Sequence, residues 1–109
     1  MILGSGQQMR DYLYVEDAVR ALILIAERAV AGQDYNVASG EPTTIVDLAR
    51  RIARLMGCPD VRIRPTFESW PGDIARWYAD VRKLRELGFE PRVDLETGLG
   101  RTIDWVRRC

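Results

Sequence analysis

The chain has 109 residues, enough for one domain with a modest hydrophobic core. Sixteen basic and 16 acidic residues give a formal net charge of zero, so no long-range field favours nucleic acid or an anionic membrane. The absence of histidine removes the commonest general base and the commonest zinc ligand. The two cysteines, Cys58 and Cys109, form no metal-ligand pair, and we expect reduced thiols in a cytoplasmic protein.

The first stretch of interest is GSGQQMRDYLYVED, residues 4–17. It opens with a glycine-rich turn, and its aromatic and β-branched content predicts a strand over residues 9–15. Asp17 then falls in the first turn of a helix, where a carboxylate complements the helix dipole. Arg10 lies just ahead of this strand-to-helix junction, and a guanidinium offers paired donors to phosphate oxygens. The alternative is a solvated arginine at the end of a strand.

The first helix is predicted to run from Glu16 to Ala31 and to end before Gly32. Its segment ALILIA, residues 21–26, is apolar on every side and too short to span a bilayer. A helix that is apolar all round is normally buried on more than one face, and a domain of this size offers few such places. The first three residues are also too short for a signal peptide, so we expect no membrane association.

The remaining elements follow from apolar periodicity and capping residues. Thr44 and Asp47 have the spacing of a capping box, while Asp80 and Asp94 are each placed to cap a helix. The predicted elements are a strand at 35–38, a helix at 45–56, a strand at 61–63, a short helix ending at 87 and a last helix from 95. Residues 1–109 are therefore predicted to form a single mixed α/β domain of about three short strands and four helices.

Four stretches of the chain resemble, in the same order, the C-terminal third of a known enzyme family. These stretches are GSGxxxRDYLYVxDAV from Gly4, YNVASG from Tyr35, PGD from Pro71 and LGFEP from Leu87. The family is that of the NAD-dependent nucleotide-sugar epimerases and dehydratases, which are extended short-chain dehydrogenase/reductases. The resemblance implies that the chain is a fragment of that fold, namely its substrate-binding portion without the N-terminal Rossmann portion.

The resemblance also implies roles for individual residues. An arginine matching Arg10 contacts the pyrophosphate of the nucleotide sugar, and an aspartate matching Asp73 approaches the nucleotide ribose. Asp73 could instead satisfy the amides of its turn.

Many members carry a second pyrophosphate-binding arginine where this chain has Trp70, whose indole could stack on a base or cover the core. Arg76, Arg64 or a residue outside the chain could supply the second contact instead. Trp77 and Tyr78 are interpreted as packing residues.

The catalytic parts of the family are missing from this sequence. Its chemistry needs a glycine-rich cofactor turn and a tyrosine four residues before a lysine. The third glycine of a G-x-G-x-x-G turn from Gly4 would fall at Met9, and Lys83 is the only lysine, with no tyrosine at the required spacing. We therefore expect no cofactor site in this chain, although NAD or NADP is implied for the full-length family.

Two functional hypotheses remain, because the residues of an independent enzyme of another class are lacking. The chain is either the nucleotide-sugar-binding portion of an epimerase or dehydratase, not competent alone, or a stand-alone module that associates with itself. The resemblance places the first helix and residues 35–38 against a cofactor domain that this chain lacks. We therefore expect a homo-oligomer, with a dimer favoured, formed by mutual packing or by exchange of the first strand and helix.

Overall fold

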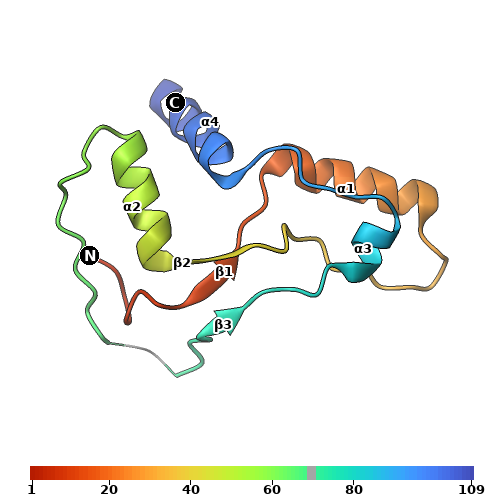
Figure 1. Cartoon of the computed structure of the whole chain (residues 1–109), viewed down its shortest axis with the longest axis horizontal. Helices are drawn as coiled ribbons and strands as arrows, with labels where there is room; N and C mark the ends of the chain where they lie inside the picture. Colours follow the sequence, from red (N-terminus) through yellow and green to blue (C-terminus); the bar gives the residue numbers. More distant parts are fainter. Residues whose placement is uncertain (69–70) are drawn as a thin grey trace.

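The computed structural model describes residues 1–68 and 71–109. Within these residues it contains three strands and four helices, which confirms the predicted mixed α/β fold (Figure 1). In chain order the elements are β1 (Met9–Asp11), α1 (Val15–Arg28), β2 (Pro42–Thr44), α2 (Ile45–Leu55), β3 (Arg76–Trp77), α3 (Arg82–Glu86) and α4 (Leu95–Arg108).

The strand β1 lies at the centre of the sheet, whose order is β2-β1-β3. It pairs antiparallel with β2, which places Arg10 opposite Thr43, and parallel with β3, which places Arg10 opposite Trp77 and Met9 opposite Arg76. Successive side chains of a strand point to opposite faces of the sheet. Arg10 and Trp77 therefore share one face, and Met9 and Arg76 share the other.

The predicted strands at 35–38 and 61–63 are wrong, because neither segment is a strand in the structure. A strand needs a neighbour to complete its hydrogen-bond ladder, and no described strand runs beside residues 35–38. In that segment the Asn36 side chain instead donates to the carbonyl of Asp80 at 3.2 Å. The strands on either side of β1 are β2 and β3, which the sequence did not predict, and β1 itself is shorter than predicted.

Two of the predicted helix starts are confirmed in detail. The Thr44 hydroxyl accepts a hydrogen bond from the amide of Asp47 at 3.2 Å, at the start of α2. The Asp94 carboxylate accepts one from the amide of Thr97 at 2.7 Å, at the start of α4. Each side chain satisfies a backbone donor that the first turn of a helix leaves without a partner.

Two other helix limits differ from the prediction. Helix α1 ends at Arg28, because Ala29 adopts an extended conformation, and the chain turns at Gly32 with φ +80°. Asp80 is not the N-cap of α3, a position that belongs to Val81. The Asp80 carboxylate lies one residue earlier, where it accepts from the amide of Arg82 at 3.0 Å.

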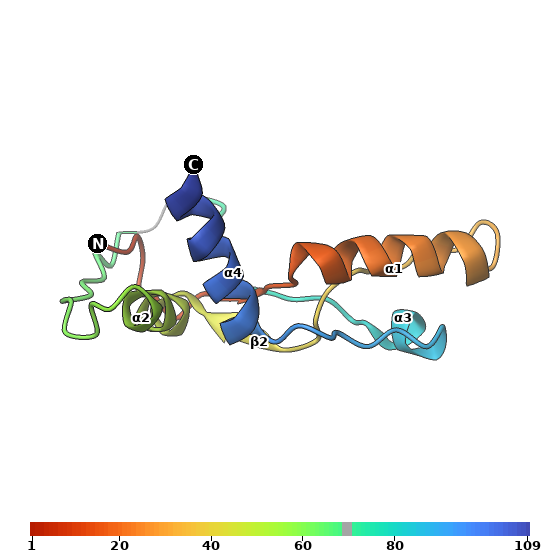
Figure 2. The ribbon, with the colours of Figure 1, turned by 90° about the horizontal axis from the view of Figure 1, so that it is seen from above.

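The fold is open, with a small core. Ala21, Leu84 and Phe89 form the buried cluster, which joins α1 to α3 and to the segment after it. The Cα radius of gyration is 16.2 Å, against about 13 Å for a compact domain of this length. Helices α1 and α3 extend to one side, while α2 and α4 lie at the other end (Figures 1 and 2). No described helix has both the length and the apolarity needed to cross a membrane.

One face of α1 has no partner in this structure. Val15, Val19, Leu22 and Ile23 expose between 49% and 63% of their surface, whereas Ala21 on the opposite side is fully buried. From the sequence we expected that a domain of this size could not bury all of the apolar side chains of this helix. The exposed face of α1 is that surface.

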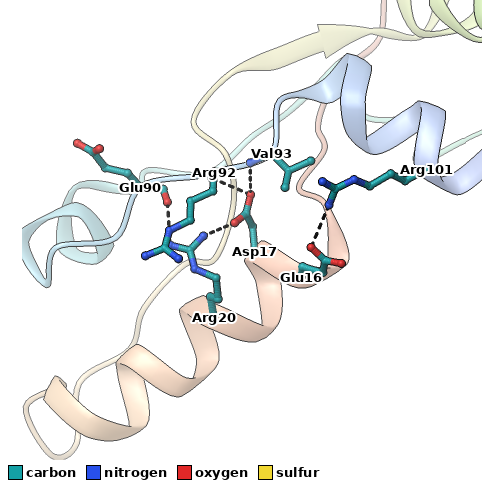
Figure 3. Close-up of polar contacts among 7 residues, drawn as sticks. All are labelled: Glu16, Asp17, Arg20, Glu90, Arg92, Val93 and Arg101. Carbon is teal, nitrogen blue, oxygen red and sulfur yellow. Dashed lines mark hydrogen bonds and ion pairs between the residues drawn. The ribbon is translucent and has the colours of Figure 1, made fainter.

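Asp17 links α1 by hydrogen bonds to the chain segment that precedes α4 (Figure 3). Its carboxylate is 1% exposed, accepts from the amides of Arg92 and Val93, each at 2.9 Å, and pairs with Arg20. Burial alone raises the pKa of Asp17, but these hydrogen bonds and the Arg20 charge together hold the pKa below its usual value. The sequence predicted only a favourable interaction with the helix dipole, since contacts to residues 92–93 are not visible in a local pattern.

Candidate functional site

Arg10 is held in place by backbone carbonyls at the centre of the sheet. Its Nη1 atom donates to the carbonyl of Met9 at 2.8 Å and to that of Ile74 at 2.7 Å. The guanidinium also lies 5.8 Å from the centre of the Trp77 ring, within the range of a cation–π interaction. These contacts engage the Nη1 atom and one face of the guanidinium, so the Nη2 atom remains available to a charged partner.

That partner in the structure is Asp73. The Asp73 Oδ1 atom lies 3.6 Å from Arg10 Nη2, and its side chain is 10% exposed. The parallel pairing of β1 with β3 brings together two residues that the sequence had singled out separately. The structure thus places Arg10 and Asp73 side by side, the arrangement needed if both were to contact one nucleotide diphosphate.

Gln8 belongs to the same cluster and was not singled out from the sequence. Its Nε2 atom donates to Asp73 Oδ2 at 3.0 Å and to the carbonyl of Leu3 at 3.3 Å. Gln8 is 8% exposed, and its Oε1 atom has no hydrogen-bond partner among the described residues. No pattern in the sequence marks Gln8: only the structure shows that Gly4 has a φ of +76° and that a Cβ atom there would collide with Gln8 Nε2.

Tyr12 comes two residues after Arg10, just beyond the end of β1. Burial raises the pKa of the Tyr12 phenol, and the positive charge of Arg10 opposes this shift only in part. The phenol therefore stays protonated at neutral pH and can act as a neutral hydrogen-bond donor.

Asp11 fixes β1 to the loop that precedes β2. Its Oδ1 atom accepts from the amide and the hydroxyl of Ser39 at 2.8 and 2.6 Å, and its Oδ2 atom accepts from the amide of Gly40 at 2.8 Å. Charge-assisted hydrogen bonds of this kind are strong. They hold the strand that carries Arg10 against a segment almost 30 residues away in the sequence.

The other aromatic and basic residues considered from the sequence have mixed outcomes. Trp70 lies outside the residues that the structure describes. The interpretation of Trp77 and Tyr78 as packing residues is wrong, because they are 64% and 51% exposed, and Trp77 contacts Arg10 instead. Arg76 cannot replace a second pyrophosphate-binding arginine beside Arg10, because it lies on the opposite face of the sheet.

The chemistry available to this cluster is recognition of an anion and of polar groups. Arg10 supplies positive charge, Tyr12 a neutral donor and Asp73 a carboxylate that can accept from hydroxyl groups. Among the described residues there is no group of three side chains suited to holding a metal ion. The cluster therefore has the composition of a binding site.

A separate apolar hollow of about 840 Å³ lies between α4 and the junction of β1 with α1. Tyr14, Val15, Leu99 and Trp105 are among the residues that line it. Val15 lines this hollow and also belongs to the exposed face of α1, so the two apolar surfaces are continuous.

Comparison with known proteins gives consistent matches over nearly the whole chain. The sequence model of the GDP-mannose 4,6-dehydratase family matches residues 1–102. The chain is 34% identical over 104 residues to a trifunctional UDP-glucose 4,6-dehydratase, UDP-4-keto-6-deoxy-D-glucose 3,5-epimerase and UDP-4-keto-L-rhamnose reductase of Arabidopsis thaliana, covering 95% of this chain and 16% of that protein. It is 36% identical over 108 residues to the UDP-glucose 4-epimerase of Mycolicibacterium smegmatis, covering 97% and 34% respectively.

The similarity extends to three dimensions. The crystal structure of UDP-glucose 4-epimerase from Thermotoga maritima with UDP-glucose matches with a TM-score of 0.88 and 34% identity, over 98% of this chain and 34% of that chain. The chain thus spans about a third or less of the length of these relatives. These matches confirm the resemblance found in the sequence, including its confinement to one portion of the relatives.

Proposed function

The chain belongs to the GDP-mannose 4,6-dehydratase family, and from this premise we propose that it is the nucleotide-sugar-binding portion of an NAD-dependent epimerase or dehydratase. Relatives with these activities align with almost all of the chain, while the chain aligns with only part of each relative. The portion acts in the cytoplasm on a nucleotide sugar. It has no role in binding nucleic acid or membranes, in keeping with its zero net charge.

The observation that carries this proposal is the pairing of Arg10, on β1, with Asp73, in the segment just before β3. Arg10 contacts the pyrophosphate, for which a guanidinium is well suited, and Asp73 accepts from the ribose hydroxyls. Tyr12, two residues after Arg10, adds a neutral donor. Trp70 covers the nucleotide or the core in place of a second arginine.

Catalysis requires a second polypeptide segment that carries the cofactor turn and the tyrosine–lysine pair. The only lysine of this chain, Lys83, instead contacts Asp34 at 3.2 Å on the surface. The exposed face of α1 and the unpaired residues 35–38 are the surfaces on which a cofactor-binding segment would dock. The chain alone therefore binds no NAD and has no turnover.

Without that segment the chain covers its exposed apolar surface by associating with itself, most simply as a dimer. The second candidate function is that of a stand-alone interaction module derived from the family, which acts by this self-association. The exposed face of α1 favours this candidate independently of the Arg10 site.

The binding proposal is tested by titrating UDP-, GDP- and dTDP-sugars with ligand-detected NMR. One charge-assisted contact contributes about 1.5–3 kcal/mol, far less than the roughly 8 kcal/mol of a micromolar complex. We expect millimolar affinity that is lost in Arg10→Ala and kept in Arg76→Ala, the matched arginine on the other face of the sheet. Equal affinity of the two variants would show that Arg10 is not the phosphate contact.

A further inference from the structure

Gln8 belongs to the candidate site, yet the proposed function gives it no role. It lies just before β1, two residues from Arg10, and the Asp73 carboxylate contacts both side chains. Asp73 Oδ2 accepts from Gln8 Nε2 at 3.0 Å, while Asp73 Oδ1 lies 3.6 Å from Arg10 Nη2. Gln8 and Arg10 therefore approach one carboxylate through different oxygen atoms.

The two contacts of Asp73 are of different kinds. An N–H···O hydrogen bond spans about 2.7–3.2 Å and depends on angle. The Gln8 contact at 3.0 Å meets this criterion, and the Arg10 contact at 3.6 Å does not. A Coulomb attraction at the longer distance has little directional preference. Arg10 thus supplies charge to Asp73, whereas Gln8 sets the direction of the carboxylate.

The side-chain amide of Gln8 is itself held in one orientation. Its Nε2 atom donates to two acceptors, the carbonyl of Leu3 at 3.3 Å and the carboxylate of Asp73 at 3.0 Å. Turning the amide over would place Oε1 against both acceptors with no proton to share. Gly4 leaves the space for the observed orientation, because a Cβ atom there would collide with Nε2. The donor that faces Asp73 is therefore fixed.

An amide at this place carries a penalty in stability. Gln8 is 8% exposed, and its Oε1 atom has no hydrogen-bond partner among the described residues. A buried acceptor without a hydrogen bond destabilises a fold, whereas an apolar side chain of similar size would not carry this penalty. Stability alone therefore does not account for a glutamine here, but its contact with Asp73 does.

We propose that Gln8 is a positioning residue, which holds the Asp73 carboxylate in the direction that accepts the ribose hydroxyls of a nucleoside diphosphate. The inference rests on the proposed function, which gives those hydroxyls to Asp73. A carboxylate has about four lone-pair positions, so the hydrogen bond from Gln8 leaves others for a ligand. The hydroxyls reach Asp73 through the 10% of its side chain that is exposed. Because the carboxylate is already oriented, binding does not have to order it.

The consequence is selectivity for a ribose that carries hydroxyl groups. UDP and 2′,3′-dideoxy-UDP share the base and the diphosphate and differ only in the hydroxyls that Asp73 would accept. A hydrogen bond from a ligand to a charged group corresponds to about tenfold in affinity or more. The wild type should therefore bind UDP about tenfold more tightly than the dideoxy compound.

The test is an NMR titration of the labelled chain with UDP and with 2′,3′-dideoxy-UDP, in the wild type and in Gln8→Met. Methionine is close to glutamine in length but donates no hydrogen bond. In Gln8→Met the preference for UDP should fall to near unity, mainly through weaker binding of UDP. Gln7→Met is the matched control, because Gln7 is the preceding residue and is exposed. It should keep the preference of the wild type.

The outcomes separate this inference from the proposed function. A preference that persists in Gln8→Met overturns the positioning role. Equal weakening of both ligands in Gln8→Met also overturns it, because that is the result of a general disturbance of the site. A UDP affinity that Arg10→Ala leaves unchanged overturns the proposed function and this inference with it.

A measurement without ligand tests the contact itself. The sequence contains Gln7, Gln8, Gln33 and Asn36 as its side-chain amides, so the signals of Gln8 are identified by their loss in Gln8→Met. The Gln8 amide hydrogens should exchange with solvent more slowly than those of Gln7, and Asp73→Ala should speed this exchange. Equal exchange at Gln7 and Gln8, or exchange that Asp73→Ala leaves unchanged, overturns the inference whatever the ligands do.

Discussion

Replacement of Asp17 by asparagine tests whether this buried carboxylate holds α1 against the chain that precedes α4. The substitution keeps the size of the side chain and one oxygen that can accept from the amides of Arg92 and Val93. It removes the negative charge, and with it the ion pair with Arg20 (Figure 3). The change therefore isolates the charge of a group that is 1% exposed.

The expected loss is large for a domain of this size. A hydrogen bond to a charged group contributes about 1.5–3 kcal/mol against about 1 kcal/mol for a neutral one, and breaking a buried ion pair costs about 3–5 kcal/mol. Because Arg20 is partly exposed and can be rehydrated, we expect a loss of about 2–4 kcal/mol in the free energy of unfolding. The whole free energy of unfolding of such a domain is about 5–15 kcal/mol.

Urea denaturation at pH 7, followed by circular dichroism, measures this loss. Protein concentration must be fixed, because association contributes to apparent stability. Glu16→Gln is the matched control, since Glu16 is the preceding carboxylate and pairs with Arg101 on the surface at 3.1 Å. An exposed pair contributes about 0–1 kcal/mol. An Asp17→Asn loss no larger than that of Glu16→Gln would refute the structural role given to Asp17.

The lowered pKa of Asp17 also predicts how the free energy of unfolding changes with pH. The pKa of Asp17 is lowered in the folded state, so its contribution is complete above the unfolded pKa of about 4. The contribution is lost as the pH falls through the folded pKa. The difference in stability between the wild type and Asp17→Asn should therefore shrink between pH 5 and pH 2. A difference that grows on acidification would contradict this explanation.

Three further outcomes are expected. Ile23→Glu should convert the dimer to a monomer in sedimentation while retaining the helical circular dichroism signal, because Ile23 is 52% exposed in the protomer; an unchanged dimer would place the interface elsewhere. Asp94→Ala should lower the free energy of unfolding by about 0.5–2 kcal/mol through loss of the α4 cap, whereas Asp104→Ala, inside the same helix, should lower it by less. Titration of NAD against tryptophan fluorescence should give no saturation, and micromolar binding would show that the chain holds a cofactor site that its sequence does not reveal.

The sequence predicted the helices better than the strands, for a physical reason. A helix forms its backbone hydrogen bonds within one segment, so the caps at Thr44 and Asp94 could be identified locally. A strand depends on a neighbour, and residues 35–38 have strand-like composition but no described strand beside them. The strands β2 and β3 are too short to show a period of two, and only their pairing with β1 defines them.

The candidate site was predicted in part. Arg10 and Asp73 were singled out by resemblance to family motifs, but their contact arises from parallel pairing between distant segments and could not be derived from spacing. Gln8 was missed because a buried amide has no local sequence signature. Exposure of Trp77 was missed because an indole is normally a packing residue, whereas here it covers the guanidinium of Arg10.

The most direct test of the proposed function is a titration of the isotope-labelled chain with UDP-glucose, followed through its backbone amide resonances. The account predicts shifts at β1 around Arg10 and at the segment from Gly72 to Ile74, with millimolar affinity. Resonances of Arg85, on α3, should not move. Shifts spread evenly over the chain, or shifts confined to α3 while Arg10 and Asp73 stay unchanged, would contradict the assignment of a nucleotide-sugar site to this face of the sheet.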